Sequence, residues 1–146
     1  MKKFDLAIIG GGPTGINCAI AATKAGLDYI VLEKGVLVNS LYNFPVNMTF
    51  FSTSQKLEIG GIPFISHGEK PTRSEALEYY RRLIHKFDLN IRLYEAVASM
   101  NRQENGLYLI KSAKEDYLAR SVCYIGRWSH DSRAINIGKV IRLSRK

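Results

Sequence analysis

Three glycines form the sequence feature with the clearest chemical meaning. Gly10, Gly12 and Gly15 make a G-x-G-x-x-G loop that follows a short apolar run at residues 4–9 and opens a segment of helical spacing. In that context Gly10 permits a tight turn, Gly12 lets the backbone approach a pyrophosphate, and Gly15 lets helix and strand pack closely. The free amides at the helix N-terminus would face the phosphates, and Pro13 suits the first helical turn.

An acidic residue after the next apolar run completes the pattern. Glu33 lies 23 positions after Gly10, near the spacing of about 20 at which a carboxylate accepts hydrogen bonds from an adenosine ribose. A carboxylate there repels a 2′-phosphate, so NADP is a poor candidate for this loop. The pattern predicts a site for the pyrophosphate of an adenine dinucleotide. It leaves FAD and NAD open, because both contain the same ADP half, and the alternative is a structural turn with Glu33 as a surface charge.

A strand–helix–strand unit is needed to position these residues, and the sequence predicts one. Residues 4–9 have the composition of a buried parallel strand, and residues 12–25 that of a helix. Gly26 suits the left-handed position that ends a helix, and residues 28–32 form a second short strand. Residues 34–70 show many turn formers and no clear period, and so long an irregular connection is usually functional.

The second half of the chain predicts one more helix and several short strands. Thr72 and Glu75 have capping-box spacing, so we expect the Thr72 hydroxyl to accept from the Glu75 amide and the Glu75 carboxylate to accept from the Thr72 amide. Asn105-Gly106 predicts a type I′ hairpin turn with positive φ at both residues. The expected strands are residues 91–94, 97–102, 107–111 and 117–120, and residues 121–125 form a last apolar run. The predicted fold class is α/β: a Rossmann-like domain with a parallel sheet, a βαβ start and a small antiparallel β-meander.

Composition and charge exclude several classes of function. The net charge of +8 is uneven: residues 1–119 carry 14 Lys and Arg against 12 Asp and Glu, and residues 120–146 carry seven against one. We therefore expect a basic tail and no nucleic-acid partner. No apolar run approaches the ~20 residues that span a bilayer, so we expect no membrane partner and a cytoplasmic location. The two cysteines, Cys18 and Cys123, form no C-x-x-C pair and no metal cluster, and we expect Cys18 to pack in the core.

Several stretches carry a resemblance to a known family. Residues 1–35 resemble the N-terminal FAD fingerprint of the flavoprotein reductases that have two dinucleotide-binding domains, among them thioredoxin reductase. Residues 39–52, 57–64, 70–73, 75–77 and 79–81 resemble the subgroup called bacillithiol disulfide reductases. The likeness covers about residues 4–120, and it favours FAD over NAD.

The resemblance also implies a role for each residue at the site. For Met48, Phe50 and Phe51 the alternative to a role at the site is a position in the hydrophobic core. The implied FAD contacts are Gly10, Gly12, Pro13, Thr14 and Gly15 at the pyrophosphate, Glu33 at the ribose, Lys34, Asn39 and Ser40 along the adenosine and phosphates, Met48 and Thr49 near the flavin, and Val97 at the adenine through its backbone.

This sequence departs from that subgroup in three respects. Thr14 stands where members often carry a cysteine, and threonine cannot exchange with a disulfide. No C-x-x-C dithiol is present. Such reductases are considerably longer and insert an NADPH domain after the meander. We therefore expect a truncated product: residues 1–120 would be the N-terminal part of an FAD-binding domain, and residues 121–146 a basic tail that is non-native or a remnant of the missing NADPH domain.

The expected function is the FAD-binding portion of an NADPH-dependent, disulfide reductase-like oxidoreductase. In a full-length enzyme hydride would pass from NADPH to the flavin and then to a disulfide or another acceptor. With no NADPH domain we expect little or no turnover by this chain, so its status as an enzyme stays open. The alternative is a non-catalytic dinucleotide-binding module. A homodimer is open, and we assign no catalytic residue, including His67, His85 and His130.

Overall fold

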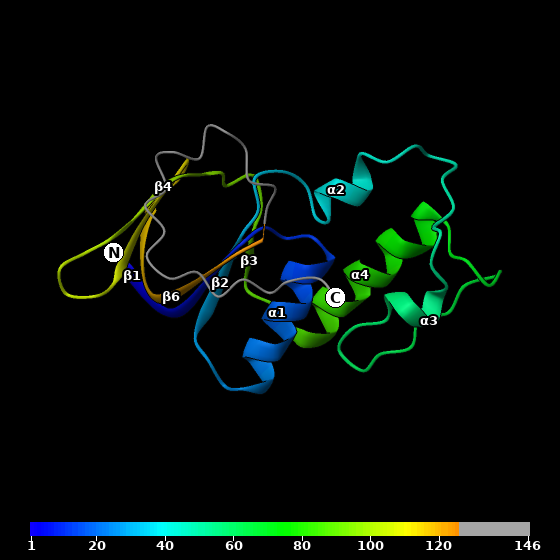
Figure 1. The fold of residues 1–146 in the computed structure, drawn as a ribbon, viewed down its shortest axis with the longest axis horizontal. Helices are drawn as coiled ribbons and strands as arrows, with labels where there is room; N and C mark the ends of the chain where they lie inside the picture. Colours follow the sequence, from blue (N-terminus) through cyan, green and yellow to red (C-terminus); the bar gives the residue numbers. More distant parts are fainter. Residues whose placement is uncertain (126–146) are drawn as a thin grey trace.

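The computed structural model describes residues 1–125, which form one mixed sheet with helices against it. The six strands have the order β3-β2-β1-β6-β5-β4. Figure 1 shows α1 and α4 next to each other beside the parallel strands, with the β4–β5 hairpin at the far end of the molecule from α3. The elements are β1 (Lys2–Ile9), α1 (Pro13–Lys24), β2 (Tyr29–Leu32), α2 (Asn39–Tyr42), α3 (Ser54–Leu57), α4 (Arg73–Phe87), β3 (Ile91–Arg92), β4 (Val97–Arg102), β5 (Tyr108–Ser112) and β6 (Asp116–Tyr124).

Strand β1 is the centre of the parallel part of the sheet, with β2 on one side and β6 on the other. Because successive side chains of a strand point to opposite faces, β1 serves two cores. Ile8 packs with the helices, whereas Ala7 and Ile9 pack with the meander. The predicted α/β fold with a βαβ start and an antiparallel meander is confirmed.

The helix-side core explains why α1 and α4 cover the same face of the sheet. Ile16 and Ile20 of α1 meet Leu83 of α4 and Val31 of β2 in one buried cluster. The opposite face is closed by the meander, where Met100, Ile110 and Tyr117 pack against residues of β1 and β2. Among residues 1–125 no helix is long and apolar enough to cross a bilayer.

Helix α1 approaches β1 closely because of Gly15. A Cβ atom added at Gly15 would overlap the carbonyl oxygen of Gly10, which is a backbone atom and cannot swing aside. The other end of α1 matches its prediction: Gly26 has φ +70°, and the Leu27 amide donates to the Ala22 carbonyl at 3.0 Å.

One of the two predicted capping contacts is present at the start of helix α4. The Thr72 hydroxyl accepts from the Glu75 amide at 3.2 Å. The reciprocal contact is different from the prediction: the Glu75 carboxylate accepts from the Thr72 hydroxyl at 3.0 Å and from the His67 amide at 3.1 Å. The Glu75 carboxylate therefore binds both the loop that precedes α4 and the N-cap residue of the helix.

Three local predictions are corrected by the structure. The predicted strand 117–120 continues into the apolar run that follows it, so that Asp116–Tyr124 is one strand, β6, which lies along β1. The expected strand at 91–94 shortens to β3 because Tyr94 takes a left-handed φ of 52°. In the β4–β5 hairpin only Gly106 has a positive φ, +83°, so the turn is not type I′. The Gly106 amide donates to Gln103 at 2.9 Å, which is typical of a turn that ends in a left-handed glycine.

A buried carboxylate fastens the meander to the parallel strands. Glu95 is 1% exposed, and its Oε1 accepts from the Tyr117 hydroxyl at 2.7 Å and the Ser112 hydroxyl at 2.6 Å. Burial by itself raises the pKa of Glu95, but these two hydrogen bonds, with Lys114 and Arg92 nearby, lower the pKa below its usual value. The Glu95 carboxylate is thus held ionised inside the fold.

Replacing Glu95 by alanine should lower the free energy of unfolding by about 1–3 kcal/mol, because the Tyr117 hydroxyl loses its buried partner. Glu95→Gln should cost less at pH 7. Since the folded-state pKa of Glu95 is depressed, its stabilising effect is present above the unfolded pKa and disappears as pH falls through the folded pKa. Urea unfolding at pH 7 and in acid checks this. If Glu95→Ala lowers the free energy of unfolding by the same amount at pH 7 and in acid, the network is contradicted.

Gly15→Ala should destabilise the protein by about 3 kcal/mol, because the added methyl overlaps backbone. Helix propensity alone predicts the opposite sign, a gain of about 1 kcal/mol. Gly26→Ala is the matched control: nothing lies within 4 Å of its Cβ position, so only the left-handed strain of about 1 kcal/mol remains. If Gly15→Ala and Gly26→Ala lower the free energy of unfolding equally in denaturant titrations, α1 does not approach the Gly10 carbonyl as closely as described.

Candidate nucleotide-binding site

The glycine loop leaves β1 in a sharp turn that only glycine fits. Gly10 has φ +115°, and its amide donates to the Leu32 carbonyl at 2.9 Å. A Cβ atom there would overlap the carbonyl oxygen of Ile125, whose amide donates to Ile9 at 2.8 Å. The end of β6 therefore lies directly behind the loop, a contact that the sequence did not predict.

The N-terminus of α1 is arranged as an anion site. Gly12 is the N-cap residue in extended conformation, and no side chain of the described residues caps the helix. The first turn carries no acidic residue, and Pro13 occupies an early position where no amide is needed. The nearest atom to the Cβ position of Gly12 is Ser40 Oγ at 3.7 Å, and the Thr14 side chain is exposed. Among residues 1–125 no side chain forms a hydrogen bond that caps this helix end, so its partial positive charge can meet an anion.

Glu33 points back at this loop from the end of β2. Its Oε2 accepts from the Gly11 amide at 2.7 Å, and its Oε1 accepts from the Gly35 amide at 2.9 Å. The residue is 6% exposed. Gly11 was not singled out from the sequence, although its place as the middle of three consecutive glycines was a signal. A Cβ atom on Gly11 would lie 2.9 Å from the Cβ of Glu33.

Two more predicted residues lie against the loop. Asn39 fills the space where a side chain on Gly35 would go, and Ser40 is next to Gly12. Both belong to the short helix α2, which begins after Val38 in a left-handed conformation, φ 46°. Arg73 of α4 holds this helix in place. Its Nε donates to the Leu41 carbonyl at 3.2 Å, and its Nη2 donates to the Tyr42 carbonyl at 2.6 Å.

The segment that leads to Val97 runs along the other side of Glu33. The Tyr94 amide donates to the Gly35 carbonyl at 3.1 Å, and the Glu95 amide donates to the Glu33 carbonyl at 2.8 Å. Val97 begins β4 and is half-buried. Lys34 is exposed at the same edge. These predicted residues are therefore on segments that meet at one end of the parallel strands.

Met48 and Thr49 are held at the start of α4. The Arg73 amide donates to the Met48 carbonyl at 3.0 Å, and Thr49 forms an isolated bridge with Thr72. None of the hydrogen bonds described for residues 1–125 joins either residue to the glycine loop. The core alternative holds for Phe50, which packs against the helix-side core, and is wrong for Phe51, which is 97% exposed.

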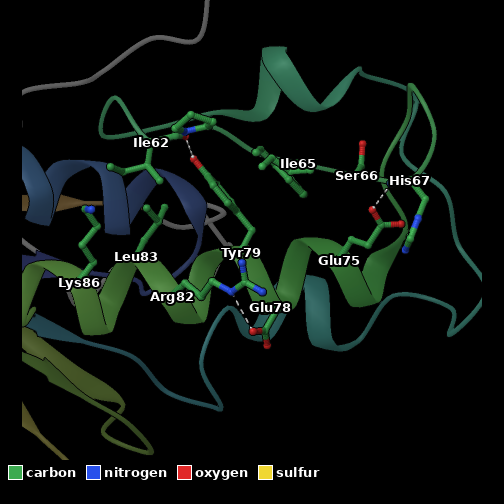
Figure 2. A pocket seen from close by; sticks show the side chains of 12 residues that line it. Ile62, Ile65, Ser66, His67, Glu75, Glu78, Tyr79, Arg82, Leu83 and Lys86 are labelled. Atoms are coloured by element: carbon green, nitrogen blue, oxygen red, sulfur yellow. Dashed lines mark hydrogen bonds and ion pairs between the residues drawn. The ribbon is translucent and has the colours of Figure 1, made fainter.

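A separate hollow of about 450 Å³ lies between α4 and the segment 62–67. Figure 2 shows Tyr79 and Leu83 on its floor and charged side chains at its rim. Three of the charged residues at the rim have partners: Arg82 Nε donates to Glu78 at 3.0 Å, and Glu75 accepts from the His67 amide at 3.1 Å. Tyr79 stacks on Phe64 at 4.3 Å between ring centroids. This hollow contains none of the predicted site residues.

Comparisons with known proteins agree with this geometry. A family model described as pyridine nucleotide-disulphide oxidoreductase matches residues 7–135. Bacilliredoxin reductase Bdr of Bacillus subtilis is 44% identical over 117 residues, covering 80% of this chain and 36% of that protein.

Two solved structures are similar in both sequence and fold. Bacillithiol disulfide reductase Bdr from Staphylococcus aureus has a TM-score of 0.82 and 40% identity, over 85% of this chain and 38% of that one. The Bacillus cereus protein of the same name has a TM-score of 0.81 and 37% identity, over 84% and 39%. The chain thus spans between a third and two fifths of these relatives. With the family model matched over most of its length, the chain belongs to the pyridine nucleotide-disulphide oxidoreductase family.

Proposed function

We propose that this chain binds FAD at the N-terminus of α1 and is the FAD-binding portion of an NADPH-dependent, disulfide reductase-like flavoprotein. The observation that carries the proposal is the uncapped helix end beside the carboxylate of Glu33. The domain that we assign to FAD is the predicted one, residues 1–120, extended along β6 to Tyr124. The predicted basic tail lies mostly outside the described residues.

The phosphates would be bound by backbone alone. The amides of Gly12, Thr14 and Gly15 are at the first turn of α1, which no side chain of residues 1–125 caps. An anion at this position also meets the positive end of the helix dipole. Gly12 has no Cβ to hold a pyrophosphate away, and Ser40 offers a hydroxyl at the edge of the same surface.

The ribose would be bound by the remaining acceptor capacity of Glu33. Each carboxylate oxygen has about two lone-pair sites, and each oxygen already accepts from one backbone amide. One site per oxygen is therefore left for a 2′- and a 3′-hydroxyl. A 2′-phosphate at this position would meet a negative charge that backbone hydrogen bonds hold in place, which favours FAD here and requires NADPH to bind elsewhere.

The other predicted contacts form a path away from this point. Val97 would meet the adenine through its backbone, while Lys34 and Asn39 would line the adenosine and phosphates. Met48 and Thr49, fixed on the start of α4, would be reached only by an extended cofactor. FAD, when bound, supplies hydride acceptance and donation, and the residues of this chain bind it and orient it.

A non-catalytic nucleotide-binding module is the second candidate. It is favoured by Thr14, which replaces a residue capable of disulfide exchange, and by the lack of a C-x-x-C dithiol in the sequence. The relatives named disulfide reductases extend well beyond the matched stretch.

Absorption spectra distinguish the two candidates. The purified chain, reconstituted with FAD and freed of excess ligand, should keep the visible absorbance of a flavin. Bleaching on addition of NADPH would further support an enzyme, whereas a colourless chain that still binds ADP-ribose compounds would support the module. A chain that retains no flavin would refute the proposal.

Glu33→Gln should weaken FAD binding roughly tenfold to a hundredfold, since a charged hydrogen-bond acceptor contributes about 1.5–3 kcal/mol. It should also improve binding of the 2′-phosphorylated form of ADP-ribose relative to ADP-ribose. Glu104→Gln, in the exposed hairpin loop, is the control with the same change of charge. Calorimetric titration measures the change in FAD affinity and the ratio of the affinities for the two forms of ADP-ribose. If the two variants bind FAD equally well, Glu33 has no part in the site.

A further inference from the structure

The hollow between α4 and the segment 62–67 has an apolar floor. Tyr79 and Leu83 of α4 line this floor, and both are buried. Ile62 and Ile65 line the hollow as well, and Ile65 is 87% exposed although it is a large apolar residue. The volume of the hollow, about 450 Å³, is within the range of small-molecule sites, about 300–1,000 Å³. An apolar group seated there would remove these side chains from water, which favours binding.

The charges at the rim of this hollow are unevenly distributed along α4. Figure 2 shows Lys86 at one end of the hollow and Glu75 at the other. Between them, Glu78 accepts a hydrogen bond from Arg82 Nε at 3.0 Å. None of the ion pairs and hydrogen bonds described for residues 1–125 involves the Lys86 ammonium. One end of the hollow therefore has a cation with which no carboxylate of the described residues is paired.

The spacing of the two cations on α4 gives a second reason for an anion at this end. Arg82 and Lys86 are four positions apart, so they are neighbours on one face of the helix. Like charges in that arrangement repel each other. Arg82 donates to Glu78 through Nε, and a guanidinium has further N–H donors. An anion between the two side chains would relieve their repulsion and accept hydrogen bonds from both.

We propose that this hollow binds a small amphipathic molecule with one negative charge, an aryl or alkyl carboxylate or sulfonate. Its apolar body would cover Leu83 and Ile65, and its charged group would accept from Lys86 and Arg82. A second anionic group farther along the ligand would approach Glu75, which disfavours nucleotides and other ligands of high negative charge. The hollow contains none of the residues that we assign to FAD, so this site does not depend on the proposed function.

Fluorescence titration of the full chain with 8-anilinonaphthalene-1-sulfonate, an aromatic probe with one negative charge, tests the proposal. We expect one saturable site per chain with a dissociation constant on the order of 10–100 µM. Excess ADP-ribose should not displace the probe. Displacement by ADP-ribose would place the probe at the nucleotide site and overturn the proposal. The absence of a saturable site, as expected if a second copy of the chain covers the hollow, would overturn it as well.

Replacing Lys86 tests the charged end of the site. Lys86→Met removes the ammonium but keeps most of the apolar stem, and it should weaken probe binding about threefold at low salt, the effect expected for an exposed ion pair. Lys111→Met, at an exposed position of β5, makes the same change of charge away from the hollow and should leave binding unchanged. High salt should remove the difference between Lys86→Met and the unaltered chain.

Replacing Ile65 tests the apolar part of the site. Ile65→Ser should weaken probe binding roughly fivefold to tenfold, because the ligand then buries less apolar surface. Since Ile65 is exposed, the substitution should change the stability of the fold little. Val46→Ser, at another exposed apolar position outside the hollow, is the control. If Lys86→Met and Ile65→Ser both bind the probe as tightly as the unaltered chain, the probe does not occupy the hollow and the proposal fails.

Discussion

The carboxylate of Glu33 is the contact on which the geometry of the site depends. It accepts from the Gly11 amide on one side and the Gly35 amide on the other, so it ties the turn after β1 to the turn after β2. A buried carboxylate without such donors would be costly. The two backbone amides offset that cost and leave the outer lone pairs free. The same interaction that stabilises the loop therefore orients the group that we assign to a ribose.

Helix α1 and the meander hold the Glu33 region in this geometry from two sides. Gly15 brings α1 so close to Gly10 that the helix N-terminus opens directly over the turn. From the other side, the Glu95 amide donates to the Glu33 carbonyl while the Glu95 carboxylate is held by Tyr117 and Ser112. The meander is thereby fixed to the end of β2, and the segment before Val97 becomes a wall of the same site.

The sequence predicted the parts of this arrangement that depend on neighbours along the chain. Gly10, Gly12, Gly15 and Glu33 follow a spacing set by one strand, one helix and the next strand, so their positions were predictable. Gly11, Gly35 and the Tyr94–Glu95 contact were not, because they depend on the meeting of segments far apart in sequence. The hairpin turn was mispredicted because one left-handed glycine, Gly106, was enough to close it.

Binding of FAD at the N-terminus of α1 can be measured by a nuclear magnetic resonance titration of the nitrogen-15-labelled chain with FAD, repeated with ADP-ribose. If FAD binds at this helix end, both ligands should shift the amide resonances of Gly12, Thr14 and Gly15, while those of His67 and Arg82, at the separate hollow, should stay in place. Loop amides that do not move at saturating FAD, or shifts confined to the hollow, would contradict it.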